Sequence, residues 1–460
     1  MPMEFSTALV PRDFVWGVST SAYQIEGAAS EDGRGPSIWD TRCRIPGKIA
    51  NGETGDVACD HYHRYAEDVA LMKAIGVGAY RFSIAWPRVL PTGRGTANEP
   101  GLAFYDRLID ELLNAGIEPW LCLYHWDLPQ ALDDLGGWTN RDSAAWFADY
   151  AALVARRYGD RVKRFATFNE FSVFTLFGYT NDWGAPGIMD RAAHLKAIHH
   201  VNLAHGAAVD VLRATVPNAS IGAIHNRQRV FPEQDTPEDR AAAALLDAHW
   251  NSAFPDPQIL GFYPTALTDA LAPYIKAGDM DRIRRPIDWF GLNHYGPIFA
   301  KADPNAVWGF AWGDAPDEAP ITDIGWPVFP EAFRDELVDI TRRYRLPVYV
   351  TENGCGGTHD APDQAGVVND AHRISYLNKH IGAMLDAVAL GADVRGYFVW
   401  SLLDNFEWGN GYKQRFGLVY VDYPTQKRTP KESAHWYAEL IKRAAEIAKP
   451  LPASRADAPQ

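Results

Sequence analysis

The sequence predicts an α/β protein folded as a single (β/α)8 barrel (a TIM barrel), with long loops over the face at which the strands end. Eight short β-rich runs alternate with amphipathic helical stretches along most of the 460 residues, a pattern typical of a parallel sheet built from βα units. A doubly wound sheet fits the alternation too, but no GxGxxG or GxxxxGKS/T motif follows any run. Eight units close into one barrel better than into two or three open sheets.

The predicted strands are short and rich in β-branched and aromatic residues. In chain order they cover residues 14–18, 79–85, 119–124, 164–168, 220–224, 289–293, 347–351 and 395–401. Between them, apolar residues recur three and four positions apart, which predicts helices at 61–76, 104–116, 143–159, 203–215, 331–344 and 373–391. Several of these stretches end in Gly, a common helix stop.

Long loops follow the first, fourth and sixth strands, and the longest covers about residues 296–330. The sequence does not reveal the structure of these loops, but in a barrel they cover the C-terminal face, where active sites lie. We therefore expect one catalytic domain over residues 1–447. The remaining residues, 448–460, are expected to be a disordered tail.

Composition excludes several functional classes. The 44 basic and 58 acidic side chains give a net charge of −14, which disfavours nucleic acid as a partner, because phosphate binding needs clustered Lys and Arg. The four cysteines form no CxxC pair, so reduced thiols are expected. No signal peptide and no run of about 18 apolar residues occurs, and we expect a soluble cytoplasmic protein without a membrane partner.

Polar residues at the ends of the predicted strands are the candidate site, because such residues point into the mouth that all strands of a parallel barrel share. They are Arg81, His125, Asn169, Glu170, Asn293 and Glu352. Two glutamates on opposite sides of one mouth are the groups that acetal hydrolysis needs. One carboxyl protonates the leaving oxygen, and the other attacks the anomeric carbon or activates water.

Each of these residues also has a purely structural interpretation. A single glutamate at a strand end can be a helix cap or an ion-pair partner, and Arg81 can be its counter-ion. Beside a carboxylate nucleophile, however, an arginine keeps that group ionised. It is the combination of two glutamates with an asparagine, an arginine and aromatic residues that favours the catalytic interpretation.

Aromatic residues gather in the segment 397–423, where Trp400, Trp408 and Phe416 alternate with acidic and basic side chains. A flat ring beside hydrogen-bonding side chains suits a sugar, although a core strand followed by a polar loop gives the same pattern. A metal site is disfavoured, because His61 and His63 fall in a predicted helix, where residues two apart diverge. His199, His200 and His205 also lack ligand spacing, so no metal and no cofactor are expected.

Together, several motifs resemble the signatures of the glycoside hydrolase family 1 β-glycosidases. FVWGVSTSAYQIEGA is similar to the first-strand signature, HWDLPQ and TFNE to the ends of the third and fourth strands, and VTENG to the nucleophile motif. WSLLDNFEWGNGYKQRFGLVYVDY resembles the C-terminal signature. The resemblance runs from about Phe14 to the final helix.

The resemblance implies a role for each matching residue. Glu352 is then the nucleophile and Glu170 the acid/base, with Arg81, Asn293 and Tyr295 supporting them. Sugar binding is implied for Gln24, His125, Asn169, Glu407 and Trp408, with Trp400 as the stacking floor, and an aglycone contact for Trp326. We also place Phe416 on the aglycone side.

Two residues depart from the family pattern. Phe171 stands where a proline usually follows the acid/base, and we expect it to reshape the aglycone side. His294 stands in GLNHY where another aromatic residue is common. Neither change affects the two glutamates.

The function implied is a retaining β-glycosidase that releases terminal β-D-glucosyl, β-D-galactosyl or β-D-fucosyl residues through a covalent glycosyl-enzyme. Small β-glycosides or cello-oligosaccharides are the expected substrates, and an oligomer is left open. The alternatives are a 6-phospho-β-glycosidase, which Glu407 disfavours because its charge repels a phosphate dianion, a metal-dependent barrel hydrolase, and a non-catalytic sugar-binding barrel.

Overall fold

The barrel predicted from the sequence is present in the computed structural model, which describes residues 3, 10–11 and 13–447. Its strands, in the order in which they are hydrogen-bonded, are β1 (Val15–Ser19), β2 (Ala79–Ser83), β3 (Glu118–Cys122), β4 (Arg164–Asn169), β5 (Ser220–Asn226), β7 (Trp289–Asn293), β10 (Val348–Asn353) and β11 (Val394–Trp400). All neighbouring pairs are parallel, and β11 closes the barrel onto β1. The expected tail at 448–460 lies outside the described residues.

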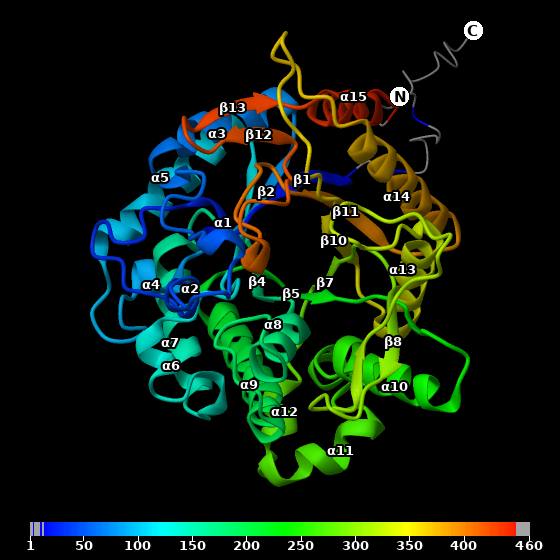
Figure 1. The fold of residues 1–460 in the computed structure, drawn as a ribbon. Coiled ribbons are helices and arrows are strands. Elements are labelled where there is room, and N and C mark those ends of the chain that lie inside the picture. Colours follow the sequence, from blue (N-terminus) through cyan, green and yellow to red (C-terminus); the bar gives the residue numbers. More distant parts are fainter. Residues whose placement is uncertain (1–2, 4–9, 12, 448–460) are drawn as a thin grey trace, which may run out of the picture.

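Long helices surround the barrel (Figure 1). They are α3 (His61–Ile75), α5 (Glu99–Ala115), α7 (Ser143–Tyr158), α9 (Arg191–Thr215), α13 (Pro330–Tyr344), α14 (Ala371–Ala389) and α15 (Glu432–Ile447). Shorter helices are α1 (Ala22–Ile25), α2 (Ile38–Cys43), α4 (Trp86–Val89), α6 (Gln130–Asp133), α8 (Phe171–Tyr179), α10 (Pro237–Asp247), α11 (Thr265–Leu271) and α12 (Asp279–Ile283). The six predicted helices are all confirmed, with α9 beginning earlier than expected.

Local sequence explains several helix ends. Ser37 and Asp40 form a reciprocal capping box at the start of α2, and the Asp190 side chain accepts a hydrogen bond from the Ala193 backbone N–H at the start of α9. Gly76 ends α3 with a φ of 87°, a left-handed conformation that costs glycine little.

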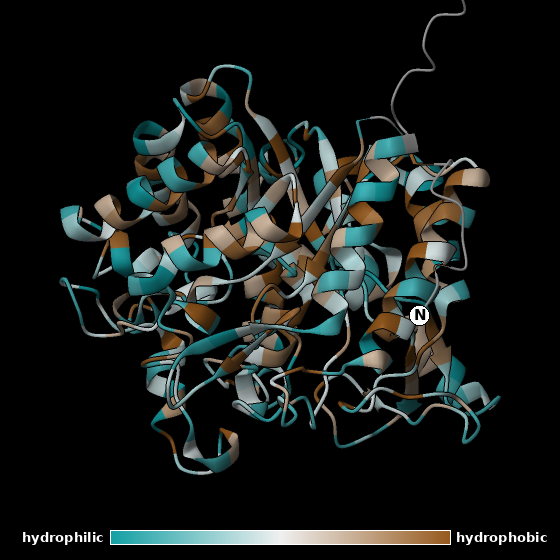
Figure 2. Cartoon of the chain, turned by 90° about the horizontal axis from the view of Figure 1, so that it is seen from above, coloured by the Kyte–Doolittle hydropathy of each residue, from teal (hydrophilic) through white to brown (hydrophobic). Residues whose placement is uncertain are grey.

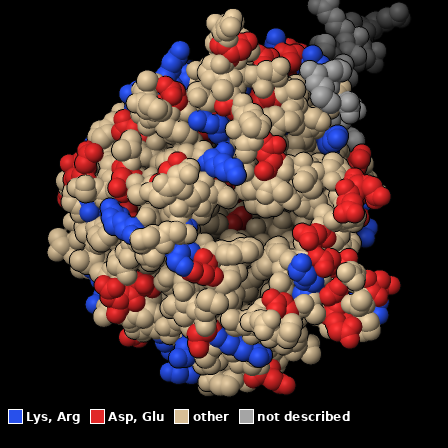
Figure 3. All heavy atoms as spheres, in the orientation of Figure 1, with Lys and Arg blue, Asp and Glu red and all other residues tan. Residues whose placement is uncertain are grey.

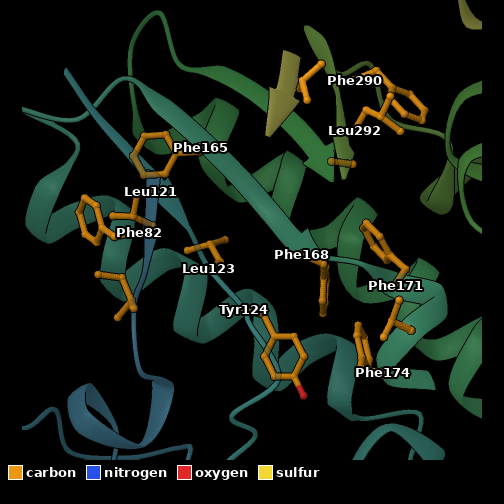
Figure 4. Packing of buried hydrophobic residues seen from close by; sticks show 14 of the residues in the cluster. Phe82, Leu121, Leu123, Tyr124, Phe165, Phe168, Phe171, Phe174, Phe290 and Leu292 are labelled. Atoms are coloured by element: carbon orange, nitrogen blue, oxygen red, sulfur yellow. The ribbon is translucent and has the colours of Figure 1, made fainter. Parts of the chain in front are cut away.

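Two apolar layers hold the barrel together. The interior contains a separate cluster that includes Trp120, Trp289, Tyr349 and Phe398, and a Cβ on Gly222 would lie 2.2 Å from the Trp289 ring, so these rings fill the interior. A much larger cluster packs the strands against the helices, with Phe82, Leu121 and Phe165 among the side chains drawn in Figure 4. In Figure 2 the helices alternate between hydrophilic and hydrophobic residues, as amphipathic helices do.

The loops over the mouth contain additional strands. β6 (Val230–Pro232), β8 (Ile298–Ala302) and β9 (Phe310–Trp312) form a small sheet, and β12 (Val419–Asp422) pairs with β13 (Lys427–Pro430). The longest loop therefore carries two strands that the sequence did not reveal, because three to five residues show too few alternations to identify a strand. In the described part of the chain, no helix is long and apolar enough to cross a membrane.

Candidate active site

Glu352 lies at the end of β10 and is held by two donors. Arg81, at the centre of β2, donates from Nη1 to Glu352 Oε1 over 2.5 Å, and the Tyr295 hydroxyl donates to Oε2 over 2.5 Å. The pairing of β10 shifts register between Val350 and Glu352. Such a bulge changes the direction of the side chains that follow it, and here the strand delivers Glu352 to the mouth.

Glu170 follows β4 at the opposite side and has an unusual backbone. Its φ of 53° and ψ of 64° are left-handed, an uncommon conformation for a residue other than glycine, and it immediately precedes α8. The β4–β5 pairing also shifts register just before it. Asn293 Nδ2 donates to Glu170 Oε1 over 2.8 Å and to Asn169 Oδ1 over 3.0 Å.

The surroundings of the two carboxyls give them different pKa values. Burial and then the charge of Glu352 raise the pKa of Glu170 well above its usual value. Burial raises the pKa of Glu352 too, but Arg81 and Tyr295 oppose that rise. Of the two, Glu170 therefore keeps the proton and Glu352 carries the negative charge.

Several residues for which the resemblance implies sugar binding lie close together in the mouth. Gln24 Nε2 donates to the Phe406 carbonyl over 2.8 Å and lies 3.4 Å from Glu407 Oε2. Burial, together with the charge of Glu352, raises the pKa of Glu407 to about 8. His125 lies between two indoles, its ring centre 5.8 Å from that of Trp400 and 6.0 Å from that of Trp408.

His125 is oriented by Asn169. The Asn169 side-chain nitrogen and His125 Nε2 are 3.1 Å apart, while His125 Nδ1 has no hydrogen-bond partner among the described residues. Burial, and secondarily the charge of Arg81, lowers the imidazole pKa well below its usual value, so the ring is neutral. A buried nitrogen of this kind can bond to a hydroxyl group of a bound molecule.

A buried ionic network holds the segment that carries Trp400 and Glu407. Lys431 Nζ lies 2.7 Å from Asp404 Oδ1 and 2.6 Å from Asp360 Oδ2, and Arg415 donates to the other oxygen of Asp404 over 2.8 Å. Asp360 belongs to the loop that follows β10, so the network connects the two segments that bear Glu352 and Glu407.

Further from the two carboxyls, three aromatic residues line the side of the mouth that carries Glu352. Trp326 packs against Tyr295 at a ring-centre distance of 5.0 Å and against Phe416 at 5.9 Å. The space-filling view shows a hollow near the centre of this face with acidic atoms on its floor (Figure 3). The mouth thus combines a polar floor with aromatic walls.

The two residues that depart from the family pattern lie away from this surface. Phe171 is fully buried, stacked 5.0 Å from His225 and tilted against Phe254 at 5.3 Å, so its side chain does not itself line the aglycone side. It packs behind Glu170 instead. His294 is also buried, and its ring contacts Phe333 of α13 at 4.9 Å.

The two histidines of the HxH pair bond to carboxylates of the protein. As expected, His61 and His63 lie in α3, where Nδ1 of His61 bonds to Asp68 and Nδ1 of His63 to Asp60. The described residues contain no group of three or more His, Cys, Asp or Glu that could hold a metal ion.

The sequence interpretation missed three residues that complete the site. Trp126 donates to the Asn169 carbonyl over 3.0 Å and packs 4.6 Å from Trp408. Thr351 donates to Asn293 Oδ1 over 2.7 Å, and Asn405 accepts from Gln24 over 2.9 Å. Trp126 and Thr351 stand next to His125 and Glu352 in the sequence. This position beside a candidate residue is the signal that could have identified them.

A closed (β/α)8 barrel with two carboxyls at its mouth, one beside Arg81 and the other beside the neutral Asn293, is the arrangement of the glycoside hydrolase class. Comparisons with known proteins agree. A model of "Glycosyl hydrolase family 1" matches residues 6–446. Beta-glucosidase A of Thermotoga maritima is 44% identical over 437 residues, which cover 94% of this chain and 97% of that protein.

Solved structures give the same result. The psychrophilic beta-glucosidase of Micrococcus antarcticus has a TM-score of 0.91 and 44% identity, with 95% of this chain and 99% of that chain covered. The Thermotoga maritima beta-glucosidase in complex with glucoimidazole has a TM-score of 0.90 and 43% identity, with 95% and 99% covered. The chain therefore belongs to glycosyl hydrolase family 1, and its enzyme class is that of the retaining β-glucosidases.

Proposed function

We propose that Glu352 and Glu170 hydrolyse β-D-glucosides by double displacement. Glu352 attacks the anomeric carbon while Glu170 gives its proton to the leaving oxygen, forming a covalent glucosyl-enzyme. Esterification removes the charge of Glu352, which lowers the pKa of Glu170, and Glu170 then takes a proton from the water that releases glucose. The single observation that carries this proposal is the difference in partners: Glu352 is held by the cation Arg81 and the hydroxyl of Tyr295, whereas Glu170 accepts from the neutral Asn293.

Contacts in the structure support the roles proposed for the neighbouring residues. Arg81 and Tyr295 keep Glu352 ionised and fix its direction, and Asn293 orients Glu170. The sugar hydroxyls are assigned to polar groups of five residues, with the Trp400 ring as the floor of the subsite. These residues are Gln24, His125, Asn169, Glu407 and Trp408. The aglycone leaves past Trp326 and Phe416.

A proton NMR time course with p-nitrophenyl β-D-glucopyranoside, run without added metal and again with a chelator, tests the reaction. Retention predicts that β-glucose appears first and converts slowly to the α anomer. Early α-glucose contradicts double displacement, and loss of activity with the chelator contradicts the metal-free mechanism. A parallel assay with p-nitrophenyl 6-phospho-β-D-glucoside tests the 6-phospho-β-glycosidase alternative, which a faster reaction of the phosphorylated substrate would favour.

The substrate range is proposed to include small aryl or alkyl β-glucosides and cello-oligosaccharides. One relative, 41% identical over 463 residues, is named a bifunctional beta-D-glucosidase/beta-D-fucosidase and comes from Bifidobacterium breve. Parallel kcat/KM measurements with the β-glucoside, β-galactoside and β-fucoside of p-nitrophenol test this range.

We also propose a cytoplasmic enzyme without nucleic-acid or membrane partners. Fractionation of the producing cells tests this location.

A further inference from the structure

A cavity of about 630 Å³ lies among the outer helices of the barrel and is called here the outer cavity. It lies between the C-terminal part of α13, the start of α11 and the segment that joins α10 to α11, and α11 is at the outer edge of the molecule in Figure 1. The described residues that line it are all different from those assigned to the mouth. Small-molecule sites typically measure about 300–1,000 Å³, so the outer cavity is large enough to be one.

Two π-helical segments contribute to the lining. They are η4 (Ala248–Ser252) and η5 (Asp256–Leu260), which follow one another between α10 and α11. The π conformation is rare and occurs frequently at functional sites. Ala248, Ser252 and Asp256 all line the outer cavity, so the irregular backbone and the cavity coincide.

Arg227 supplies a buried donor to the outer cavity. The residue is only 8% exposed, and its Nε donates to Glu336 over 2.5 Å while Nη1 donates to the Tyr344 hydroxyl over 2.9 Å and to the Asn251 carbonyl over 3.2 Å. Its third nitrogen, Nη2, has no hydrogen-bond partner among the described residues. A buried donor without a partner costs free energy, and this one is available to a molecule in the cavity that Arg227 lines.

The charges of the lining are balanced, and several of its polar atoms are available. Three arginines and three aspartates line the outer cavity. Arg343 binds Asp256 through Nε and Nη2, at 3.1 and 2.6 Å, which leaves its Nη1. Arg342 pairs with no acidic group in the described part of the chain, and Asp247 accepts from Asn251 through Oδ1 alone. Balanced charge with both donors and acceptors favours a neutral polar molecule over an ion.

An aromatic ring stands at the edge of the outer cavity. Phe262 is 54% exposed and belongs to the lining. The hydroxyls of Ser252 and Thr265 lie in the same lining and can each donate or accept. An exposed ring beside directed hydrogen-bonding groups suits a sugar, which packs its C–H face on the ring and bonds through its hydroxyls.

We propose that the outer cavity is a second sugar-binding site, which takes glucose or a short cello-oligosaccharide. The inference rests on the proposed function, because these are the sugars that the mouth is proposed to release or to hydrolyse. Phe262 is the platform for a sugar ring, Arg227 and Arg342 donate to its hydroxyls, and Asp247 accepts from them. The outer cavity holds the sugar at the surface and takes no part in hydrolysis.

Saturation-transfer NMR with glucose and with cellobiose tests this inference, with the mouth kept occupied by glucoimidazole. An open site with one ring platform should bind the sugar with a Kd of about 1–10 mM. Phe262→Ala should weaken this binding by about three- to tenfold, because the stacking is lost, and Arg342→Ala should weaken it by a similar factor. Both variants should keep the parent value of kcat/KM for p-nitrophenyl β-D-glucopyranoside, which a misfolded variant would lose.

The matched control is Phe231→Ala, because Phe231 is 40% exposed on β6 and lies outside the lining of the outer cavity. It should leave the Kd unchanged. Absence of a signal from both sugars overturns the inference, as does an unchanged Kd in both Phe262→Ala and Arg342→Ala. Binding of inorganic phosphate without either sugar also overturns it and identifies an anion site. If the unaltered enzyme does not hydrolyse p-nitrophenyl β-D-glucopyranoside, the proposed function fails, whereas the effect of the two variants on sugar binding still tests the outer cavity.

Discussion

Arg81 binds Glu352 directly, with Nη1 2.5 Å from Oε1, inside a barrel that buries both side chains. Its second nitrogen, Nη2, donates to Asn169 Oδ1 over 2.5 Å. One guanidinium therefore fixes the carboxylate proposed as the nucleophile and the residue that orients His125. In the proposed mechanism, this single side chain couples the charge of Glu352 to the position of a sugar-binding histidine.

Replacing the nucleophile gives the most direct test of its role. Glu352→Ala should lower kcat/KM at least about a thousand-fold, because the covalent path is lost. Azide can enter the space left by the side chain and attack from the same side, so rescue should give the α-glucosyl azide, identified by NMR. A β-glucosyl azide would contradict the assignment, and Glu170→Ala serves as the comparison.

Glu170→Gln should affect substrates according to their leaving groups. A poor leaving group needs a proton from Glu170, so cellobiose turnover should fall at least about a hundred-fold, whereas 2,4-dinitrophenyl β-glucoside should fall much less in the glycosylation step. The decrease of kcat/KM at alkaline pH should also disappear, because it reports deprotonation of Glu170, whose pKa is raised. Equal losses on both substrates would remove Glu170 from the acid role.

Tyr295→Phe removes one donor to Glu352 and keeps the ring that packs on Trp326. Since Tyr295 lowers the pKa of Glu352, the pKa should rise, and the acidic limb of the kcat/KM profile should move to higher pH. The alkaline limb should move less. Arg81→Lys should shift the acidic limb in the same direction, and an acidic limb that moves to lower pH in either variant would contradict this account of Glu352.

Glu407→Gln should change stability in a pH-dependent manner. The folded protein raises the pKa of Glu407 to about 8 from an ordinary value of 4.5, so the folded state holds the proton between these pH values and the unfolded state does not. Stability contributed by this group is therefore lost as pH rises from about 4.5 through about 8. The gain in Tm of Glu407→Gln over the parent should be larger at pH 8 than at pH 5, and the reverse order would show that Glu407 is ionised in the fold.

Lys431→Met breaks the buried network with Asp404 and Asp360 while keeping the length of the side chain. Two carboxylates then lose a buried cation, which should cost about 3–5 kcal/mol of unfolding free energy. Chemical denaturation measures this loss. Lys442→Met, a change of the same type on the exposed side of α15, should alter stability by less than about 0.5 kcal/mol.

Prediction from the sequence worked best where the pattern was local. The strand β7 was predicted with its observed bounds, and Glu170 and Glu352 were selected because each ends an apolar strand. The short strands β8 and β9 were missed, because three to five residues within a Pro-rich loop show no clear period.

Contacts between distant segments were largely hidden. The network of Lys431 joins residues 27 and 71 positions apart, and no sequence period reports such pairs. The burial of Phe171 was hidden for a similar reason. Its neighbours His225 and Phe254 come from later segments, so its burial behind Glu170 could not be inferred from the motif around it.

The backbone of Glu170 sets a limit on engineering for heat resistance. A left-handed conformation strains a side-chain-bearing residue, and its buried carboxyl has a neutral asparagine as its hydrogen-bond partner. Glycine at this position would relieve the strain and remove the buried acid, so thermal stability would increase at the cost of the proposed proton donor. A more durable catalyst must therefore be sought by altering the outer helices and leaving this turn as it is.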